Sequence, residues 1–174
     1  TLPKGVKMIG SNAFANCSRL ESINIPDGIT VIESGVFAGC ASLKSIIIPD
    51  GVTMIEGRAF SGCSSIVSIS VPNGVTSLEA NVFEGCTSIT SFIVPDSVTL
   101  IDLNVFLACE NLKELVIPGS VTKIDHNAFY YCTSLTDITF KGTKEQWIAA
   151  IGDYNWYYHT VSVIHCIDGD ITIE

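Results

Sequence analysis

Basic residues and long apolar runs are both scarce in this sequence, and each shortage excludes a class of function. The 174 residues include nine Lys and Arg against eighteen Asp and Glu, which gives a net charge of −9. Nucleic-acid binding needs a basic stripe that neutralises phosphates, so we expect no nucleic-acid partner, and docking on an anionic lipid surface is disfavoured. No apolar run approaches eighteen residues, so we expect no insertion into a membrane.

Groups that could support catalysis are also few. The three histidines are His126, His159 and His165, so most of the chain has no histidine base. The motifs G-x-S-x-G and H-E-x-x-H and a phosphate-binding loop are missing, and the cysteines lack the close C-x-x-C pairs of metal sites. The sequence therefore predicts a protein that is not an enzyme and that needs no metal or cofactor.

The sequence does contain a strict 23-residue period. All six prolines, six of the eight phenylalanines and six of the seven cysteines recur at this spacing without an insertion. The three columns are Pro3, Pro26, Pro49, Pro72, Pro95 and Pro118; Phe14, Phe37, Phe60, Phe83, Phe106 and Phe129; and Cys17, Cys40, Cys63, Cys86, Cys109 and Cys132. Such a period is typical of a solenoid, in which identical supersecondary units stack.

Each unit combines a strand, a turn and a second apolar pair. In residues 43–49, LKSIIIP, the alternation of apolar residues predicts a short strand with one buried face, and six such strands would pair in parallel. Pro49 ends the strand, and Asp50-Gly51 is a turn pair. A later position is Asn or Gly in every unit except one, where Arg58 occupies it, and we expect a left-handed backbone there.

The cysteine column predicts a row of buried free thiols. One thiol per coil places neighbouring side chains in parallel, which is a poor geometry for a disulfide bond. The total of seven cysteines is odd, which also disfavours a disulfide framework.

The unit LKSIIIPDGVTMIEGRAFSGC resembles the BspA-like leucine-rich repeat, and the resemblance covers residues 1–140. Residues 141–174 resemble the C-terminal cap of such arrays. The resemblance implies a mainly β, right-handed solenoid with a parallel concave sheet and an α/β cap. It also implies non-catalytic adhesion or protein recognition outside the cell, on a bacterial surface. The unit that ends at Leu2-Pro3 starts before residue 1. We therefore expect the upstream sequence to continue the array or to carry a different cap, and any signal peptide to lie upstream as well.

The cap has local signals of its own. Residues 143–146, TKEQ, read as a capping box that opens a helix carrying Trp147 and Ile148. Residues 161–166 should then extend the sheet, and Asp168-Gly169 should turn the chain into a final strand. The aromatic residues of 154–158 are expected to plug the end of the stack, and the alternative is a glycan-binding patch.

The outward residues of the concave sheet are the candidate ligand surface. They include Ser45, Ile47, Ser68, Ser70, Ser91, Ile93, Glu114, Val116 and Asp137. Small serines beside exposed Ile47, Ile93 and Val116 suit an extended segment of a protein partner, and the lack of an aromatic platform disfavours a carbohydrate. Two alternatives stay open: a face without a ligand, and a spacer that projects another domain. We expect the chain to be a monomer.

An acidic column is the second candidate surface. It consists of Glu33, Glu56, Glu79, Asp102 and Asp125, one residue per unit. We expect these carboxylates to be exposed and about 5 Å apart, the spacing of neighbouring strands. Such a row could attract calcium or a basic partner, and the alternative is a solvated edge that keeps the array soluble.

Overall fold

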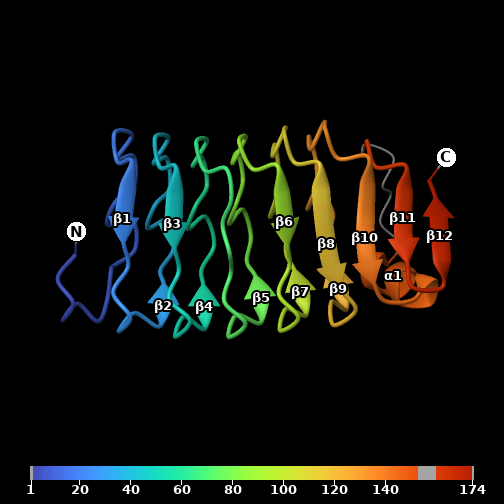
Figure 1. Ribbon diagram of the computed structural model, residues 1–174, viewed down its shortest axis with the longest axis horizontal. Helices are drawn as coiled ribbons and strands as arrows, with labels where there is room; N and C mark the ends of the chain where they lie inside the picture. The colour runs from blue at the N-terminus through green and yellow to red at the C-terminus, as the bar shows by residue number, and fades with distance from the viewer. Residues whose placement is uncertain (1, 153–159, 174) are drawn as a thin grey trace.

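The computed structural model describes residues 2–152 and 160–173. The chain winds into a stack of coils along one long axis, from the first coil at one end to a helix at the other (Figure 1). Strands of successive coils pair in parallel and form two ladders of backbone hydrogen bonds. The first ladder contains strands of three to five residues, and the second contains strands of two residues. This mainly β solenoid confirms the fold class that the 23-residue period predicts.

The first ladder comprises a two-stranded sheet and the largest sheet of the molecule. Its strands are β1 (Ser22–Asn24), β3 (Ser45–Ile47), β6 (Ser91–Ile93), β8 (Glu114–Pro118) and β10 (Asp137–Lys141). β1 pairs with β3, and β6, β8 and β10 pair in order, always in parallel. Two strands beyond the repeats extend the sheet: β11 (Val163–Cys166) pairs in parallel with β10, and β12 (Gly169–Thr172) returns antiparallel to β11. The predicted final hairpin is thereby confirmed.

The first ladder is interrupted in the third full coil. Residues 66–71 form no strand, so the predicted continuous sheet of six strands is wrong at this point. This is the coil in which both outward positions are serines, Ser68 and Ser70. Neither serine is β-branched or aromatic, so this coil lacks the outward isoleucine that favours a strand in β3 and β6.

The second ladder is interrupted beside the same coil. Its strands are β2 (Val31–Ile32), β4 (Met54–Ile55), β5 (Ser77–Leu78), β7 (Leu100–Ile101) and β9 (Lys123–Ile124). β2 pairs with β4, and β5, β7 and β9 form a separate sheet, so no pairing joins β4 to β5 among the described residues.

A third set of hydrogen bonds, the turn ladder, runs through the phenylalanine turns without a break. The Phe37 N–H donates to Ala59 O at 2.9 Å, and Phe60 and Phe83 repeat this bond to the next coil at 3.0 Å. The same bond begins at Phe14 and continues to Phe106, so the turn ladder crosses the coil at which both strand ladders stop.

The phenylalanine column forms an aromatic core behind the turn ladder. Consecutive rings stack with centroids 5.5 to 6.0 Å apart and with planes 7° to 23° from parallel. Phe92, which replaces an aliphatic residue, packs against Phe83 and Phe106 at 5.1 and 4.9 Å. Every fully buried side chain that the structure describes is apolar.

The structure confirms a left-handed backbone at the predicted Asn/Gly column and shows a second left-handed column. The first column, Arg58 included, has φ between 59° and 63°. Four residues later lies another left-handed position in every coil, and it is occupied by Asn16, Gly39, Gly62, Gly85, Ala108 and Tyr131. Two closely spaced left-handed residues turn the chain sharply, which places each phenylalanine between them in the core.

The helix α1 (Lys144–Ile151) covers the last coil beside β10 and β12 (Figure 1). Its predicted capping box is present, because the Gln146 N–H donates to Thr143 Oγ1 at 3.2 Å and the Thr143 N–H donates to Gln146 Oε1 at 2.8 Å. Trp147 is buried, and its ring lies 5.3 Å from that of Phe140. The helix therefore seals the apolar end of the repeat core.

Candidate interaction surfaces

The outward surface of the first ladder, here called the strand face, corresponds to the predicted concave face. Along β3 and β6 the side chains alternate between exposed and buried, so Ile47 and Ile93 point away from the core. Ile47 is 82% exposed, Ile93 is 67% exposed, and Val67 in the interrupted coil is 54% exposed. Large aliphatic side chains at this exposure are costly to hydrate, which makes the strand face suited to contact with another molecule.

Most of the candidate residues of the strand face are exposed, with one exception. Ser45, Ser91, Glu114 and Asp137 are exposed on their strands, whereas Val116 is only partly exposed. The prediction of an exposed Val116 is wrong because this residue lies in register between Ile93 and Thr139, which cover it from both sides. Ser68 and Ser70 are exposed too, but they lie in the segment outside the strands.

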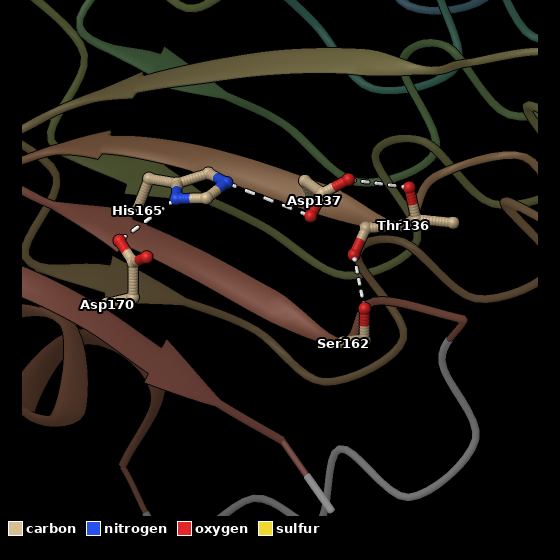
Figure 2. Close-up of polar contacts among 5 residues, drawn as sticks. All are labelled: Thr136, Asp137, Ser162, His165 and Asp170. Carbon is tan, nitrogen blue, oxygen red and sulfur yellow. Dashed lines mark hydrogen bonds and ion pairs between the residues drawn. The ribbon is translucent and has the colours of Figure 1, made fainter.

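The C-terminal end of the strand face carries a cluster of charged residues. Glu114 lies directly opposite Asp137 in register. Asp137 accepts a hydrogen bond from Thr136 Oγ1 at 2.7 Å and lies 3.7 Å from His165 Nε2, and His165 Nδ1 is 2.9 Å from Asp170 Oδ1 (Figure 2). Glu114, Asp137 and His165 border a shallow hollow of about 350 Å³, which Lys113 also lines.

The N-terminal end of the strand face is hollowed as well, but its lining differs. A groove of about 540 Å³ runs along β1 and β3 and includes Asn24, Ile47 and Pro49. Asp27 is the one ionisable residue that lines it. The strand face therefore changes along the solenoid axis from a mainly apolar and amide surface to an acidic one.

The acidic column is only partly exposed, contrary to the expectation of a solvated row. The Ser34 N–H donates to Glu56 Oε2 at 2.9 Å, and the Gly57 N–H donates to Glu79 Oε2 at 2.9 Å. Each of these carboxylates reaches back to the coil before it. They turn inward because the tight turns leave backbone amides without a backbone acceptor, and partly buried amides need one.

The two aspartates of the acidic column make shorter contacts. Asp102 Oδ1 accepts from the Leu103 N–H at 2.7 Å, and Asp125 Oδ1 accepts from the His126 N–H at 2.7 Å. An aspartate is one methylene shorter than a glutamate, so its carboxylate bonds within its own coil. The described residues contain no group of three or more His, Cys, Asp or Glu side chains that could hold a metal ion. The observed geometry assigns this column to turn structure.

The cysteine column links successive coils. Cys86 Sγ–H donates to Phe60 O at 3.2 Å, and Cys132 Sγ–H donates to Phe106 O at 3.0 Å, each in the preceding coil. Burial away from water raises the pKa of both thiols to about 12. A thiolate could not donate this hydrogen bond, so the array depends on protonated cysteines.

The prediction of buried free thiols is confirmed for five of the six cysteines of the column and is wrong for Cys17, which is exposed. Cys166 is free as well, and it is partly buried. Cys17 lies in the first described coil, where no earlier coil covers its thiol. Cys166 lies in β11, outside the repeating column.

Sequence reasoning missed the exposure of Val67 in the interrupted coil and the position of His165 at the strand face. Val67 is detectable as a break in the period, because the equivalent residues of the neighbouring coils are Lys44 and Thr90. His165 has no such signal, since it belongs to the strand added after the last repeat. Its position beside Asp137 depends on the pairing of β10 with β11.

The aromatic residues proposed for a glycan patch, among them Trp156 and Tyr157, lie outside the described residues. Tyr131, at the last repeat, is described and 58% exposed. In the described part of the chain, no helix has both the length and the apolar character that a membrane span requires.

The fold recurs in solved structures of bacterial proteins. A leucine-rich repeat protein of T. pallidum matches 80% of this chain and 71% of its own length, at 26% identity and a TM-score of 0.73. A leucine-rich cell surface protein of Faecalibacterium prausnitzii A2-165 matches 78% of this chain at 38% identity and a TM-score of 0.72, but the match spans only 36% of that protein.

A more distant likeness extends to the pneumococcal vaccine antigen PcpA, at 22% identity and a TM-score of 0.56, over 84% of this chain and 36% of that one. No curated protein matches the sequence significantly. The model of the BspA-type leucine-rich repeat region, with six copies, matches residues 1–112 and 30–162. Together with the 23-residue coils and their phenylalanine turns, this match shows that the chain belongs to the BspA-type leucine-rich repeat family.

Proposed function

We propose that the chain is a non-catalytic interaction module that binds a protein partner through the strand face. The observation that carries this proposal is the exposure of Ile47 and Ile93 at equivalent positions of β3 and β6. Apolar side chains held this far out on a rigid sheet lose their contact with water when a partner covers them. The scaffold behind them is fixed by the turn ladder, so binding requires little ordering of the module itself.

We further propose that the module acts outside the cell, on a bacterial surface, with a host matrix or surface protein as its partner. The relative from F. prausnitzii is described as a cell surface protein. PcpA is described as a vaccine antigen. This chain spans about a third of each of these proteins, so their further properties do not transfer to it.

A double substitution, Ile47→Asp with Ile93→Asp, tests the strand face. Surface plasmon resonance against a panel of immobilised host matrix and surface proteins would identify a partner of the native chain. We expect the double variant to lose at least tenfold in affinity while its circular dichroism spectrum stays unchanged. Met54→Asp is the matched control, because Met54 is 45% exposed but lies in the second ladder. The proposal would be contradicted if Met54→Asp lost affinity for the partner while the double variant kept it.

A structural spacer is the second candidate function, and the unbroken turn ladder favours it. A continuous row of hydrogen bonds from Phe14 to Phe106 suits a stiff element that projects a neighbouring domain. If the intact chain binds no protein or glycan across such panels, the spacer function gains support and the strand-face proposal fails.

A further inference from the structure

We infer that the turn Asn73-Gly74 is a site of self-modification. The chain closes a succinimide ring at Asn73, and hydrolysis of the ring leaves aspartate or isoaspartate at this position. Three features support the site: an asparagine that precedes glycine, two reacting groups without other partners, and a coil whose strands are unpaired. The inference does not depend on the strand face or on any binding partner.

The first feature is the dipeptide itself. Ring closure brings the backbone nitrogen of the following residue to the side-chain carbonyl carbon of the asparagine, and a side chain on that residue hinders the approach. Asn73 is the one asparagine of the sequence that glycine follows, and each of the other eight precedes a residue with a side chain. The equivalent turns carry Asp27, Asp50 and Asp96, and an ionised carboxylate is a much poorer electrophile than an amide.

The second feature is the freedom of the two reacting groups. Asn73 and Gly74 are exposed between the buried Pro72 and Val75, and the Val75 N–H donates to Pro72 O at 3.1 Å. Within the described residues, neither the Asn73 side chain nor the Gly74 N–H makes a hydrogen bond. No competing contact therefore holds the amide group away from the nitrogen.

Other asparagine side chains of the array are held in place. Asn81 Nδ2 donates to Glu84 Oε2 at 3.0 Å, and Asn111 Nδ2 donates to Thr87 O at 2.8 Å. Ring closure at either residue must first break this bond. These contacts add to the hindrance from the side chains of the residues that follow.

The third feature is the coil in which the turn lies. Ring closure requires the backbone of Asn73 to rotate, and pairing of the adjacent segments opposes this rotation. Residues 66–71, just before the turn, form no strand, and β5 after the turn is not paired with β4. The equivalent turn Asp50-Gly51 is closed by the same bond, from the Val52 N–H to Pro49 O at 3.0 Å, but it lies between β3 and β4, which both pair with the preceding coil. The turn at Asn73 should therefore rotate more easily.

The reaction needs no reagent other than water. The Gly74 nitrogen gives up its proton to solvent and attacks Asn73 Cγ; the N–Cγ bond forms, and the Cγ–Nδ2 bond breaks as ammonia leaves. Water then adds to one of the two carbonyl carbons of the ring. Breaking the bond from nitrogen to Cγ leaves aspartate, whereas breaking the bond from nitrogen to the backbone carbonyl carbon leaves isoaspartate.

The two products should differ in their fit to the turn. Aspartate suits it, because Asp50 and Asp96 occupy the same place in turns that the same hydrogen bond closes. Isoaspartate lengthens the main chain by one atom between Pro72 and Val75, which disturbs the bond that closes the turn. Either product makes the net charge of −9 more negative by one.

Incubation of the full 174-residue chain at pH 6 and pH 8 would test the inference. Peptide mapping by mass spectrometry follows each asparagine, and labelling by an isoaspartate methyltransferase detects the isoaspartate product. We expect Asn73 to convert at least tenfold faster than any other asparagine, and faster at pH 8 because the attacking nitrogen must lose a proton. Asn73→Gln should stop the labelling, because its longer side chain closes a less favourable ring.

The variant Asp50→Asn is the matched control, because it places the same dipeptide in the equivalent turn of a paired coil. The new asparagine at position 50 should convert at least threefold more slowly than Asn73 in the same molecule. The inference is overturned if Asn73 converts no faster than the other native asparagines. It is also overturned if position 50 of the variant converts as fast as Asn73, since the dipeptide alone would then account for the reaction.

Discussion

The turn side and the strand side of each coil differ in both backbone and side chains. On the turn side, phenylalanine, cysteine and two left-handed residues recur in every coil, and the turn ladder is unbroken. On the strand side, both ladders stop near residues 66–71, and the outward residues change from serine and isoleucine to glutamate and aspartate. The stack is held by the turn side, which leaves the strand side free to vary.

Burial follows the same division. Phe37 and Phe60 are fully buried, whereas Ile46 and Ile69 behind the strand face retain 6% and 8% exposure near the interruption. Where the sheet pairs regularly again, Leu115 and Ile138 are at most 1% exposed. The core is thus slightly more accessible to solvent behind the N-terminal part of the strand face than behind the phenylalanine turns. The turn side should therefore dominate stability, and four predictions test this comparison.

The largest effect should come from alkaline pH, which acts on thiols of the turn side. Burial raises the pKa of Cys86 and Cys132 from 9.0 to about 12, so the folded state holds their protons more tightly than the unfolded state. This contribution is fully present below pH 9 and is lost as the pH rises from 9 to 12. In that window each thiol lowers the free energy of unfolding by on the order of 1 kcal/mol per pH unit, so the pair lowers it by about 2 to 3 kcal/mol per unit.

Urea denaturation at pH 8, 9, 10 and 10.5 in a Cys17→Ser background would measure this slope. Replacing Cys86 and Cys132 with Ala should make the slope shallower by the same amount, although it lowers stability at pH 8. A pH dependence that is unchanged in the double variant would contradict the role assigned to these thiols.

The second effect is the loss of one ring from the phenylalanine column. Phe83→Ala should cost about 3 to 5 kcal/mol, because it leaves a cavity in a dry core. Phe83 contacts Phe92 as well as its two stacked neighbours, so we expect a greater loss than for Phe60→Ala. Ile93→Ala on the strand face should change stability by less than about 0.5 kcal/mol, as is usual for surface positions. Equal losses at Phe83 and Ile93, measured by urea denaturation, would remove the distinction between the two sides.

The sequence predicts the turn side better than the strand side, for a physical reason. A left-handed turn accepts few residue types, so the Asn/Gly column identifies it even where Arg58 occupies the position. The second left-handed column escapes detection because Ala108 and Tyr131 obscure its Gly pattern. On the strand side, pairing depends on backbone geometry that serine and isoleucine specify weakly, so the interruption at Ser68 and Ser70 is not predictable.

The candidate site shows the same limit. Ile47 and Ile93 stand out from the sequence because alternation fixes which face a strand residue occupies. The covering of Val116 and the proximity of His165 to Asp137 depend on neighbours one coil away. Glu56 turns inward because the Ser34 N–H of the preceding coil has no backbone acceptor. The position of such an amide depends on the folded backbone and cannot be read from the sequence.

The third effect concerns carboxylates on the two sides. Glu56→Ala should cost about 1 to 2 kcal/mol, because it leaves the partly buried Ser34 N–H without its acceptor. Glu56→Gln keeps an oxygen acceptor and should recover most of this loss. Glu114→Ala, on the strand face, should be neutral or slightly stabilising because it relieves the repulsion with Asp137. Thermal denaturation of the three variants would compare them, and a neutral Glu56→Ala would show that the acidic column is solvated after all.

The smallest effect is a gain in stability on the turn side. Ala108 has φ of 57°, a left-handed conformation that costs a residue with a Cβ about 1 to 2 kcal/mol. Glycine avoids this strain but loses about 0.5 to 1 kcal/mol in backbone entropy on folding, so Ala108→Gly should stabilise the fold by about 0.5 to 1 kcal/mol. Ala80→Gly is the matched control: Ala80 is not left-handed, so only the entropy cost remains and stability should fall. The urea midpoints of the two variants should therefore shift in opposite directions. A shift in the same direction would show that the left-handed conformation of Ala108 does not strain the fold.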